Sequence, residues 1–411
     1  MLCCVVVVWQ AYLKQKEAGR MRVIETDILI VGGGPAGLSV SAELRGVSSV
    51  LVHQDREIGK PVRTSGGSWL ADMQRLGIPE DLYQRINRMD VFSDTRALEV
   101  DISDAPAVVL DITRLYLWLA SMATSDIHCA TKFLRTEKVK GGYLSTLRTT
   151  GQGEWQVKSR QIVDASGWHC IVLESLGLNT KPARDAVGIE YEYPVDNIQM
   201  DRAILFFGSF ALAGYGWAFP TNYGTVRLGV GVIRPVSDAS PKDMMNALLA
   251  SDELARMGLP HPAGEHVNAG TIPSVAYEKQ LVYDDVIRVG DSANMATPTL
   301  GEGLRICIEQ GRLLGDALSK QTPRALKAWE RQANGTLALK YKVGFWVNQA
   351  AAKYTTANWE RSLRRMEKLP PAELMAYFKN DFSTGMIIRR VSLLVWRKVK
   401  DGARRVSGRE V

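Results

Sequence analysis

The feature that most limits how this chain can fold is a glycine-rich turn near its start. An apolar run at residues 27–31 leads into Gly32-Gly33-Gly34-Pro35-Ala36-Gly37, and a segment of helical character follows at residues 38–44. Backbone N–H groups at a helix N-terminus can approach a pyrophosphate only where side chains are absent. The strand, the GxGxxG spacing and the helix therefore predict a βαβ unit that binds a dinucleotide. The expected contacts are Gly32, Gly34, Pro35, Ala36 and Gly37.

The residue expected at the ribose of this dinucleotide departs from the usual pattern. Dinucleotide-binding folds commonly place an Asp or Glu near the end of the second strand, which we expect at residues 50–52. His53 occupies that position, and Gln54 and Asp55 follow it. A neutral histidine can accept a hydrogen bond. We assign the ribose contact to His53, with Gln54 or Asp55 as alternatives.

Two later strand ends carry acidic residues next to glycine. A strand at residues 161–163 ends in Asp164 and Gly167, and a strand at residues 286–289 runs into Gly290 and Asp291. A helix is expected from about residue 303 to residue 318. The turn before this helix contains Pro298, Gly301 and Gly303.

In this order the motifs resemble the FAD-binding set of the para-hydroxybenzoate hydroxylase-like flavoproteins. The resemblance implies that Asp291 binds the ribityl chain of FAD and that the turn ending at Gly303 offers N–H groups to the flavin ring. The residues themselves agree with this, because the positive end of the following helix can stabilise negative charge on a reduced flavin.

Two further segments are similar to the geranylgeranyl reductase branch of these flavoproteins. They are Gly59-Lys60-Pro61-Val62-Arg63 and Tyr215-Gly216-Trp217-Ala218-Phe219-Pro220, the latter followed by Gly229 and Gly231. The resemblance implies that Arg63 approaches the cofactor and that aromatic side chains line an apolar substrate cavity. The expected cavity residues are Phe207, Tyr215, Trp217 and Phe219.

The activity implied by this resemblance is hydride transfer from reduced FAD to a carbon–carbon double bond of an isoprenoid or similarly apolar molecule. NAD(P)H or another reductant would supply the electrons, and an electron-donor protein is a further expected partner. Tyr215 is our candidate for the proton donor. Alternative activities are a flavin-dependent monooxygenase or halogenase, a non-redox cyclase of terpenoids, and an electron carrier. Two departures keep them open: Thr64 stands where several reductases have cysteine, and Ile112 follows Asp111 where an arginine is usual.

Charge and cysteine content limit the remaining function classes. The net charge is +7, yet residues 361–411 contain 13 Lys and Arg against 5 Asp and Glu, so the rest of the chain is close to neutral. This excess gives no reason to expect nucleic acid, whereas the basic amphipathic pattern at residues 386–400 is typical of contact with an anionic membrane surface. The five cysteines are scattered and predict neither a metal site nor a disulfide framework. We expect a cytoplasmic protein, peripheral to the membrane.

The expected fold class is α/β. A glutathione-reductase-like FAD-binding Rossmann domain of three ββα layers would be joined to an antiparallel-sheet substrate domain and a helical C-terminus. The predicted FAD-binding domain comprises residues 25–90, 107–182 and 270–322, and the substrate domain residues 91–106 and 183–269. Residues 1–24 would form an N-terminal extension, and residues 323–411 a helical, basic region.

Overall fold

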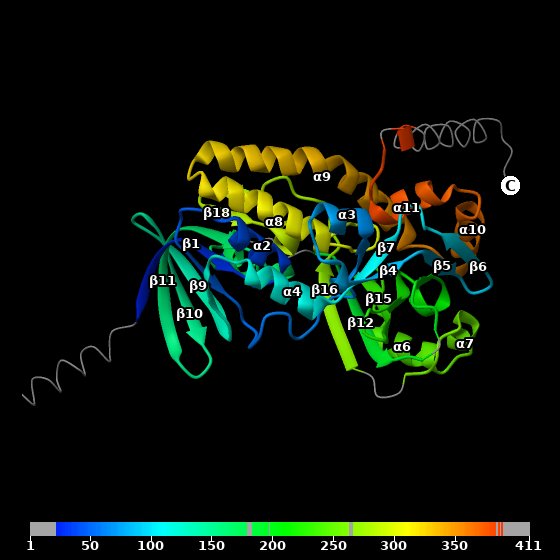
Figure 1. Ribbon diagram of the computed structural model, residues 1–411. Helices are drawn as coiled ribbons and strands as arrows, with labels where there is room; N and C mark the ends of the chain where they lie inside the picture. Colours follow the sequence, from blue (N-terminus) through cyan, green and yellow to red (C-terminus); the bar gives the residue numbers. More distant parts are fainter. Residues whose placement is uncertain are drawn as a thin grey trace, which may run out of the picture.

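The structure is a computed structural model that describes residues 22–178, 183–196, 198–262, 266–383, 385–386 and 388. It contains two large sheets and a group of helices that packs against both (Figure 1). The expected N-terminal extension, apart from residues 22–24, and most of the basic amphipathic segment lie outside the described residues.

The first sheet is built around parallel strands that begin with the strand before the glycine turn. In order across the sheet, its strands are β17 (Val282–Tyr283), β18 (Val286–Arg288), β11 (Gly153–Asp164), β1 (Val23–Val31), β2 (Ser49–Val52) and β8 (Asp126–His128). The first part of β11 also pairs with the antiparallel hairpin of β9 (Thr131–Val139) and β10 (Gly142–Thr149). A small separate sheet contains β3 (Gly67–Trp69), β7 (Ala107–Leu110) and β4 (Tyr83–Ile86).

Both faces of the central parallel strands are covered, which explains their uninterrupted apolar sequence. Ile28 and Ile30 of β1 belong to the core on the helical side, whereas Leu29 and Val31 belong to the core beneath the β9–β10 hairpin. The helical side is formed chiefly by α2 (Pro35–Glu43), α4 (Ile112–Ser121) and α8 (Leu304–Ser319). This arrangement of hairpin, sheet and helices confirms the predicted three-layer FAD-binding fold.

The second sheet is mainly antiparallel and forms the other half of the molecule. Its strands, in order, are β16 (His266–Pro273), β12 (Asp185–Pro194), β15 (Thr225–Arg234), β14 (Gly214–Pro220), β13 (Arg202–Phe206), β5 (Arg88–Phe92) and β6 (Ala97–Asp101). One face packs against α6 (Pro241–Leu249) and α7 (Glu253–Met257), and part of the other packs against α10 (Thr356–Met366) and α11 (Pro371–Lys379).

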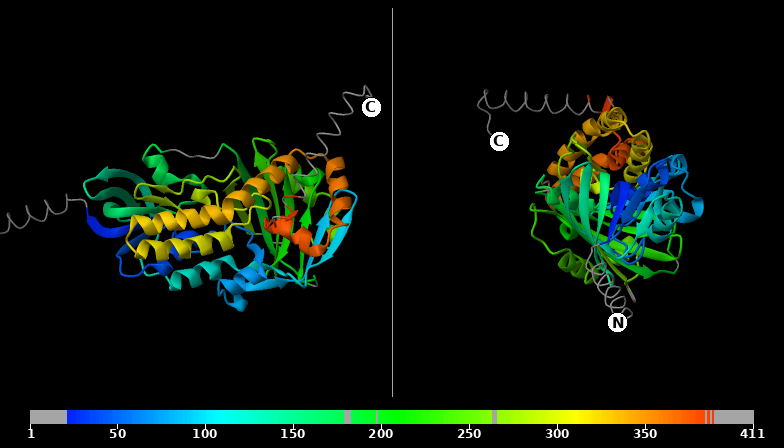
Figure 2. Two further views of the ribbon diagram at one scale, coloured as in Figure 1. Left: turned by 90° about the horizontal axis from the view of Figure 1, so that it is seen from above. Right: turned by 90° about the vertical axis from the view of Figure 1, so that its left-hand side faces the viewer.

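The long helix α9 (Pro323–Ala351) connects the two halves. It lies beside α8 and leads to α10 and α11 above the second sheet, as Figure 2 shows from two further directions. The remaining helical segments are short: α3 (Leu70–Arg75), α5 (Ile171–Ser175), η1 (Glu80–Leu82), η2 (Gly167–His169), η3 (Ser209–Ala211) and η4 (Gly290–Ala293). The C-terminal helices therefore form one wall of the space between the sheets.

The structure corrects one expectation about the second sheet. The alternation of Val226, Leu228 and Val230 with Arg227 and small residues predicts a half-exposed strand. In the structure β15 is buried on both faces, and Arg227 is 1% exposed. The sheet also begins at Arg88 and ends at Pro273, a few residues outside the segments predicted for it. Local sequence determines neither feature, because strand pairing sets the length of the strands and the loop at Ser65 covers Arg227.

Candidate functional site

The glycine turn has the shape expected of a phosphate-binding loop. A β-carbon at Gly32, whose φ is +120°, would lie 2.1 Å from the carbonyl oxygen of Ala165, and one at Gly37 would lie 2.0 Å from that of Gly32. A β-carbon at Gly34 would meet no atom within 4 Å. The fold therefore requires the outer glycines, while Gly34 borders open space at the N-terminus of α2. A pyrophosphate would fit this space, because the first N–H groups of α2 after Pro35, which itself has none, lack partners within the helix and point there.

His53, Asp55 and Arg63 lie together beside this loop. The Asp55 carboxylate accepts hydrogen bonds of 2.6 and 3.0 Å from the Arg63 guanidinium and lies 3.6 Å from Nε2 of His53. The hydrogen bond from Arg63 lowers the pKa of Asp55, and burial lowers the pKa of His53. The structure thus brings the assigned ribose residue, its acidic alternative and the expected cofactor arginine into one cluster, where either His53 or Asp55 can accept a hydrogen bond.

Asp164 and Gly167 lie behind the glycine turn. The buried Asp164 carboxylate accepts bonds from the Ser166 hydroxyl at 2.6 Å and from the N–H groups of Val172 and Leu173 at 3.2 and 3.4 Å. It therefore holds the turn after β11 to the start of α5, and its carboxylate is directed into the protein. Gly167, with φ of +76°, belongs to the same turn. A contact of Asp164 with the cofactor stays a prediction, and its visible role is to shape the loop.

Gly290 and Asp291 lie at the end of β18 against the helix of the glycine turn. A β-carbon at Gly290 would lie 2.9 Å from Cβ of Ala36. Burial raises the pKa of Asp291 to about 6. Within the described residues no group donates a hydrogen bond to the Asp291 carboxylate. A costly, unpaired carboxylate next to the phosphate loop matches a binding site for the hydroxyl groups of a ribityl chain.

The turn before α8 links the two halves of the molecule. It is closed by a hydrogen bond of 2.8 Å from the N–H of Gly301 to the carbonyl of Thr297. Gly301 has φ of +72°, and a β-carbon there would lie 2.3 Å from Cδ1 of Ile272 on β16. Pro298 lies within this turn and Gly303 is the N-cap of α8. The Tyr215 hydroxyl donates a hydrogen bond of 2.5 Å to the carbonyl of Leu300, so the sheet is attached directly to the turn expected to face the flavin.

A cavity of about 560 Å³ lies between the second sheet, the turn at residues 297–301 and the C-terminal helices. Its walls include Phe207, Tyr215 and Trp217 from the set predicted by sequence. The fourth residue of that set, Phe219, lines a neighbouring cavity of about 110 Å³, which Tyr215 also borders. The predicted aromatic residues therefore lie around two adjoining spaces.

Sequence reasoning missed the contribution of the C-terminal helices to this cavity. Trp359 of α10 stacks on Phe207 with ring centroids 4.3 Å apart, and Tyr354 packs edge-on against Trp359. Leu374 and Phe378 of α11 complete this wall. The spacing of apolar residues in these helices could have indicated a buried face, but it could not indicate which surface they cover.

Trp217 forms the floor of the cavity by lying across glycines of the neighbouring strands. A β-carbon at Gly229 would lie 2.2 Å from the indole ring, and one at Gly188 would lie 3.2 Å from it. The indole N–H donates a hydrogen bond of 2.7 Å to Glu190. The absence of side chains at these positions allows a large, flat aromatic surface on the sheet.

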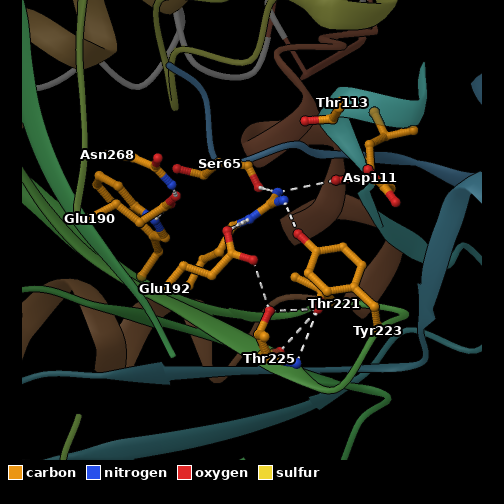
Figure 3. Close-up of polar contacts among 12 residues, drawn as sticks. Ser65, Asp111, Thr113, Glu190, Glu192, Thr221, Tyr223, Thr225 and Asn268 are labelled. Atoms are coloured by element: carbon orange, nitrogen blue, oxygen red, sulfur yellow. Dashed lines mark hydrogen bonds and ion pairs between the residues drawn. The ribbon is translucent and has the colours of Figure 1, made fainter. Parts of the chain in front are cut away.

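Arg227 is the centre of a polar network that joins the sheet to the loop after Arg63 (Figure 3). Its guanidinium donates to Glu192 at 3.0 Å, to the carbonyl groups of Ser65 and Leu110 at 2.9 and 3.1 Å, and to the Tyr223 hydroxyl at 2.5 Å. Burial opposes its positive charge, but interactions with Tyr223, Glu190 and Glu192 outweigh burial and raise the pKa of Arg227. This network fixes the loop at residues 63–65, which lines the cavity and begins at Arg63 of the cluster with His53 and Asp55.

No group of His, Cys, Asp or Glu in the described part of the chain has the arrangement of a metal site. No helix among the same residues is long and apolar enough to cross a membrane.

Comparison with known proteins agrees with this geometry. Residues 25–327 match a protein family described as an FAD binding domain. Digeranylgeranylglycerophospholipid reductase 3 of Methanosphaera stadtmanae is 25% identical over 73% of this chain and 79% of its own length. Digeranylgeranylglycerophospholipid reductase 1 of Methanothermobacter thermautotrophicus is 26% identical over 75% and 82%. These matches confirm the resemblance to the geranylgeranyl reductase branch.

Known structures share the fold. A geranylgeranyl bacteriochlorophyll reductase-like protein from Thermoplasma acidophilum superimposes with a TM-score of 0.76 at 17% identity, covering 92% of this chain and 99% of that protein. A flavin-dependent brominase gives a TM-score of 0.67 at 15% identity, covering 91% and 100%. The same architecture therefore occurs in proteins named for different flavin chemistries.

Proposed function

The chain belongs to the FAD-binding domain family, and from that premise we propose that it reduces carbon–carbon double bonds of an isoprenoid or similarly apolar substrate. The observation that supports this most is the cavity of about 560 Å³, whose mainly apolar walls adjoin the turn expected at the flavin. Such a cavity suits a long hydrocarbon and has the size typical of a small-molecule site. The names of the reductases it resembles support the same substrate class.

The residues near the glycine turn would hold FAD. Gly34 leaves space for the pyrophosphate, Asp291 would accept hydrogen bonds from the ribityl chain, and His53 or Asp55 would accept one from the ribose. The backbone of residues 298–303 would meet the ring. When bound and reduced, FAD supplies the hydride that this chemistry needs.

Tyr215 would deliver the proton that completes the reduction. Its hydroxyl lies at the border of the two cavities, bonded to the carbonyl of Leu300. Burial raises the pKa of Tyr215, so the phenol keeps its proton at neutral pH. The walls of the cavity, which include the packed side chains of Phe207, Trp217 and Trp359, would position the double bond and exclude water.

The proposal extends to the surroundings of the enzyme. NAD(P)H or a reducing protein would reduce the flavin. The basic excess of residues 361–411 would bring the protein to an anionic membrane surface, where an isoprenoid substrate would be dissolved. We place such an enzyme in the cytoplasm, at the membrane periphery.

Anaerobic reoxidation of the flavin tests the proposal. The FAD-loaded protein is reduced with dithionite under nitrogen, geranylgeraniol is added, and the flavin absorbance is followed. Return of the oxidised flavin spectrum without oxygen supports alkene reduction. Reoxidation that requires oxygen and is accelerated by the substrate would indicate a monooxygenase or halogenase, and turnover with oxidised flavin throughout would indicate a cyclase; either result would refute the proposal.

A further inference from the structure

Glu190 is a buried acidic residue in the wall of a cavity whose lining is mainly but not wholly apolar. It lies in the middle of β12, opposite Asn268 of β16 and Gly229 of β15, and the next residue in the same row is Trp217 of β14. Glu190 is 3% exposed and Asn268 is 4% exposed, and both line the cavity. An acidic side chain at such a position is costly unless it is paired or used.

The hydrogen bonds of this pair leave acceptors unused. One carboxylate oxygen of Glu190 accepts a bond of 2.7 Å from the Trp217 indole, and the other accepts a bond of 3.2 Å from the amide nitrogen of Asn268. Each carboxylate oxygen has a further lone pair. Because the amide nitrogen faces the carboxylate, the amide oxygen of Asn268 points away from it. Among the described residues nothing donates a hydrogen bond to that oxygen.

The pair faces the loop that lies next to the cofactor cluster. Ser65 lines the same cavity, and Figure 3 shows Asn268 and Glu190 side by side on the strands with Ser65 on the loop opposite. The loop at residues 63–65 lies close to β16 at Gly270, where a β-carbon would lie 2.5 Å from the Arg63 carbonyl oxygen. The acceptors are therefore at the loop end of the cavity, away from the wall formed by α10 and α11.

The positive charge of Arg227 does not by itself explain why Glu190 and Asn268 are buried side by side. Arg227 is near enough to Glu190 for their interaction to contribute to its raised pKa. However, the hydrogen bonds of Arg227 go to Glu192, Ser65, Leu110 and Tyr223, and none goes to Glu190 or Asn268. The amide oxygen of Asn268, which is buried and has no donor among the described residues, and the remaining lone pairs of Glu190 are the acceptors that Arg227 leaves unused.

From this arrangement we infer that Glu190 and Asn268 form a hydrogen-bond acceptor site for a hydroxyl group at one end of the apolar substrate. This inference rests on the proposed function for the nature of the hydrocarbon part. It adds that the substrate is amphipathic and that its polar end lies beside Ser65, while its hydrocarbon chain extends over Trp217 towards Phe207 and Trp359.

Equilibrium binding to the oxidised, FAD-loaded protein tests the inference without turnover. Geranylgeraniol and its methyl ether are titrated in the same detergent, and the change in flavin absorbance gives both dissociation constants. The ether keeps the chain but cannot donate a hydrogen bond. We expect the alcohol to bind about tenfold or more tightly than the ether, as a hydrogen bond to a charged or unsatisfied buried acceptor implies.

Two variants test whether Glu190 and Asn268 cause the preference for the alcohol. Asn268→Leu keeps the charges of Glu190 and Arg227 in place, and Glu190→Gln keeps the size of the side chain. We expect each variant to lower the ratio of the two dissociation constants to about threefold or less. Ser362→Ala, on the opposite wall, is the matched control and should keep the wild-type ratio. Bound FAD content verifies that each variant is folded.

The outcomes are distinct from those of the proposed function. Equal binding of alcohol and ether by the wild type would overturn the inference, and so would an unchanged ratio in a folded Asn268→Leu variant. A protein that prefers the alcohol but reduces no double bond would sustain the acceptor site and refute the reductase proposal instead.

Discussion

Replacing Gly34 by alanine should weaken FAD binding and leave the stability of the FAD-free protein nearly unchanged. The residue has φ of −84°, which any amino acid adopts, and its β-carbon would meet no atom within 4 Å. Alanine is a poorer N-cap than glycine, but it also lowers the entropy of the unfolded chain, and these effects oppose each other. We expect the free energy of unfolding of the FAD-free protein to change by less than about 1 kcal/mol.

The same methyl group would occupy the space assigned to the pyrophosphate. Losing one hydrogen bond to a charged group costs about 1.5–3 kcal/mol, so FAD affinity should fall by roughly 10- to 150-fold. Urea unfolding of the FAD-free protein and fluorescence titration with FAD measure the two quantities. Gly335→Ala in α9 is the control, because its β-carbon is also unobstructed but lies outside the site; it should stabilise by about 0.8–1 kcal/mol and leave FAD affinity unchanged. Wild-type FAD affinity in Gly34→Ala would refute the placement of the pyrophosphate.

Three other substitutions test separate parts of the site. Tyr215→Phe should retain FAD and slow alkene reduction by at least about tenfold, and an unchanged single-turnover rate would exclude Tyr215 as proton donor. Arg227→Met would remove the guanidinium from the partly exposed Glu192 carboxylate, which keeps its hydrogen bond from Thr225, and from the carbonyl groups of Ser65 and Leu110, so urea unfolding should show a loss of roughly 1–3 kcal/mol; an unchanged free energy of unfolding would count against the network. Burial raises the pKa of the Asp291 carboxyl to about 6. The folded FAD-free protein therefore binds the proton of this carboxyl more tightly than the unfolded chain does, and its free energy of unfolding falls as the pH rises from about 4 to 6. Asp291→Asn should remove that loss and be about 1–3 kcal/mol more stable than wild type at pH 7 but not at pH 4; equal stability at both pH values would contradict the burial of this charge.

The cofactor side of the molecule could be predicted from sequence because its requirements are local. The GxGxxG turn needs glycine at fixed spacings, and the structure shows steric crowding at Gly32 and Gly37 and open space at Gly34. Asp291 was found because it follows a strand and a glycine. Asp164 fits the same pattern, yet its carboxylate turns inward to α5, since a strand end does not specify which way the next side chain points.

The cavity side could be predicted only in part because its groups meet across strands and helices. Glu190 and Asn268 are far apart in the sequence and become neighbours through the register of β12 and β16. Arg227 has the alternation of an exposed residue and is buried because a loop covers that face of the sheet. Trp359 reaches the cavity through the packing of α10, which local spacing does not reveal.

If this flavoprotein adds hydrogen to a carbon–carbon double bond, the composition of the product shows it most directly. The FAD-loaded protein is incubated anaerobically with dithionite and geranylgeraniol, and the extracted lipid is analysed by mass spectrometry. We expect a product that has gained two hydrogen atoms for each double bond reduced. No such product should form when FAD is omitted. A product that has gained oxygen once air is admitted, or an isomer of unchanged mass, would contradict this expectation.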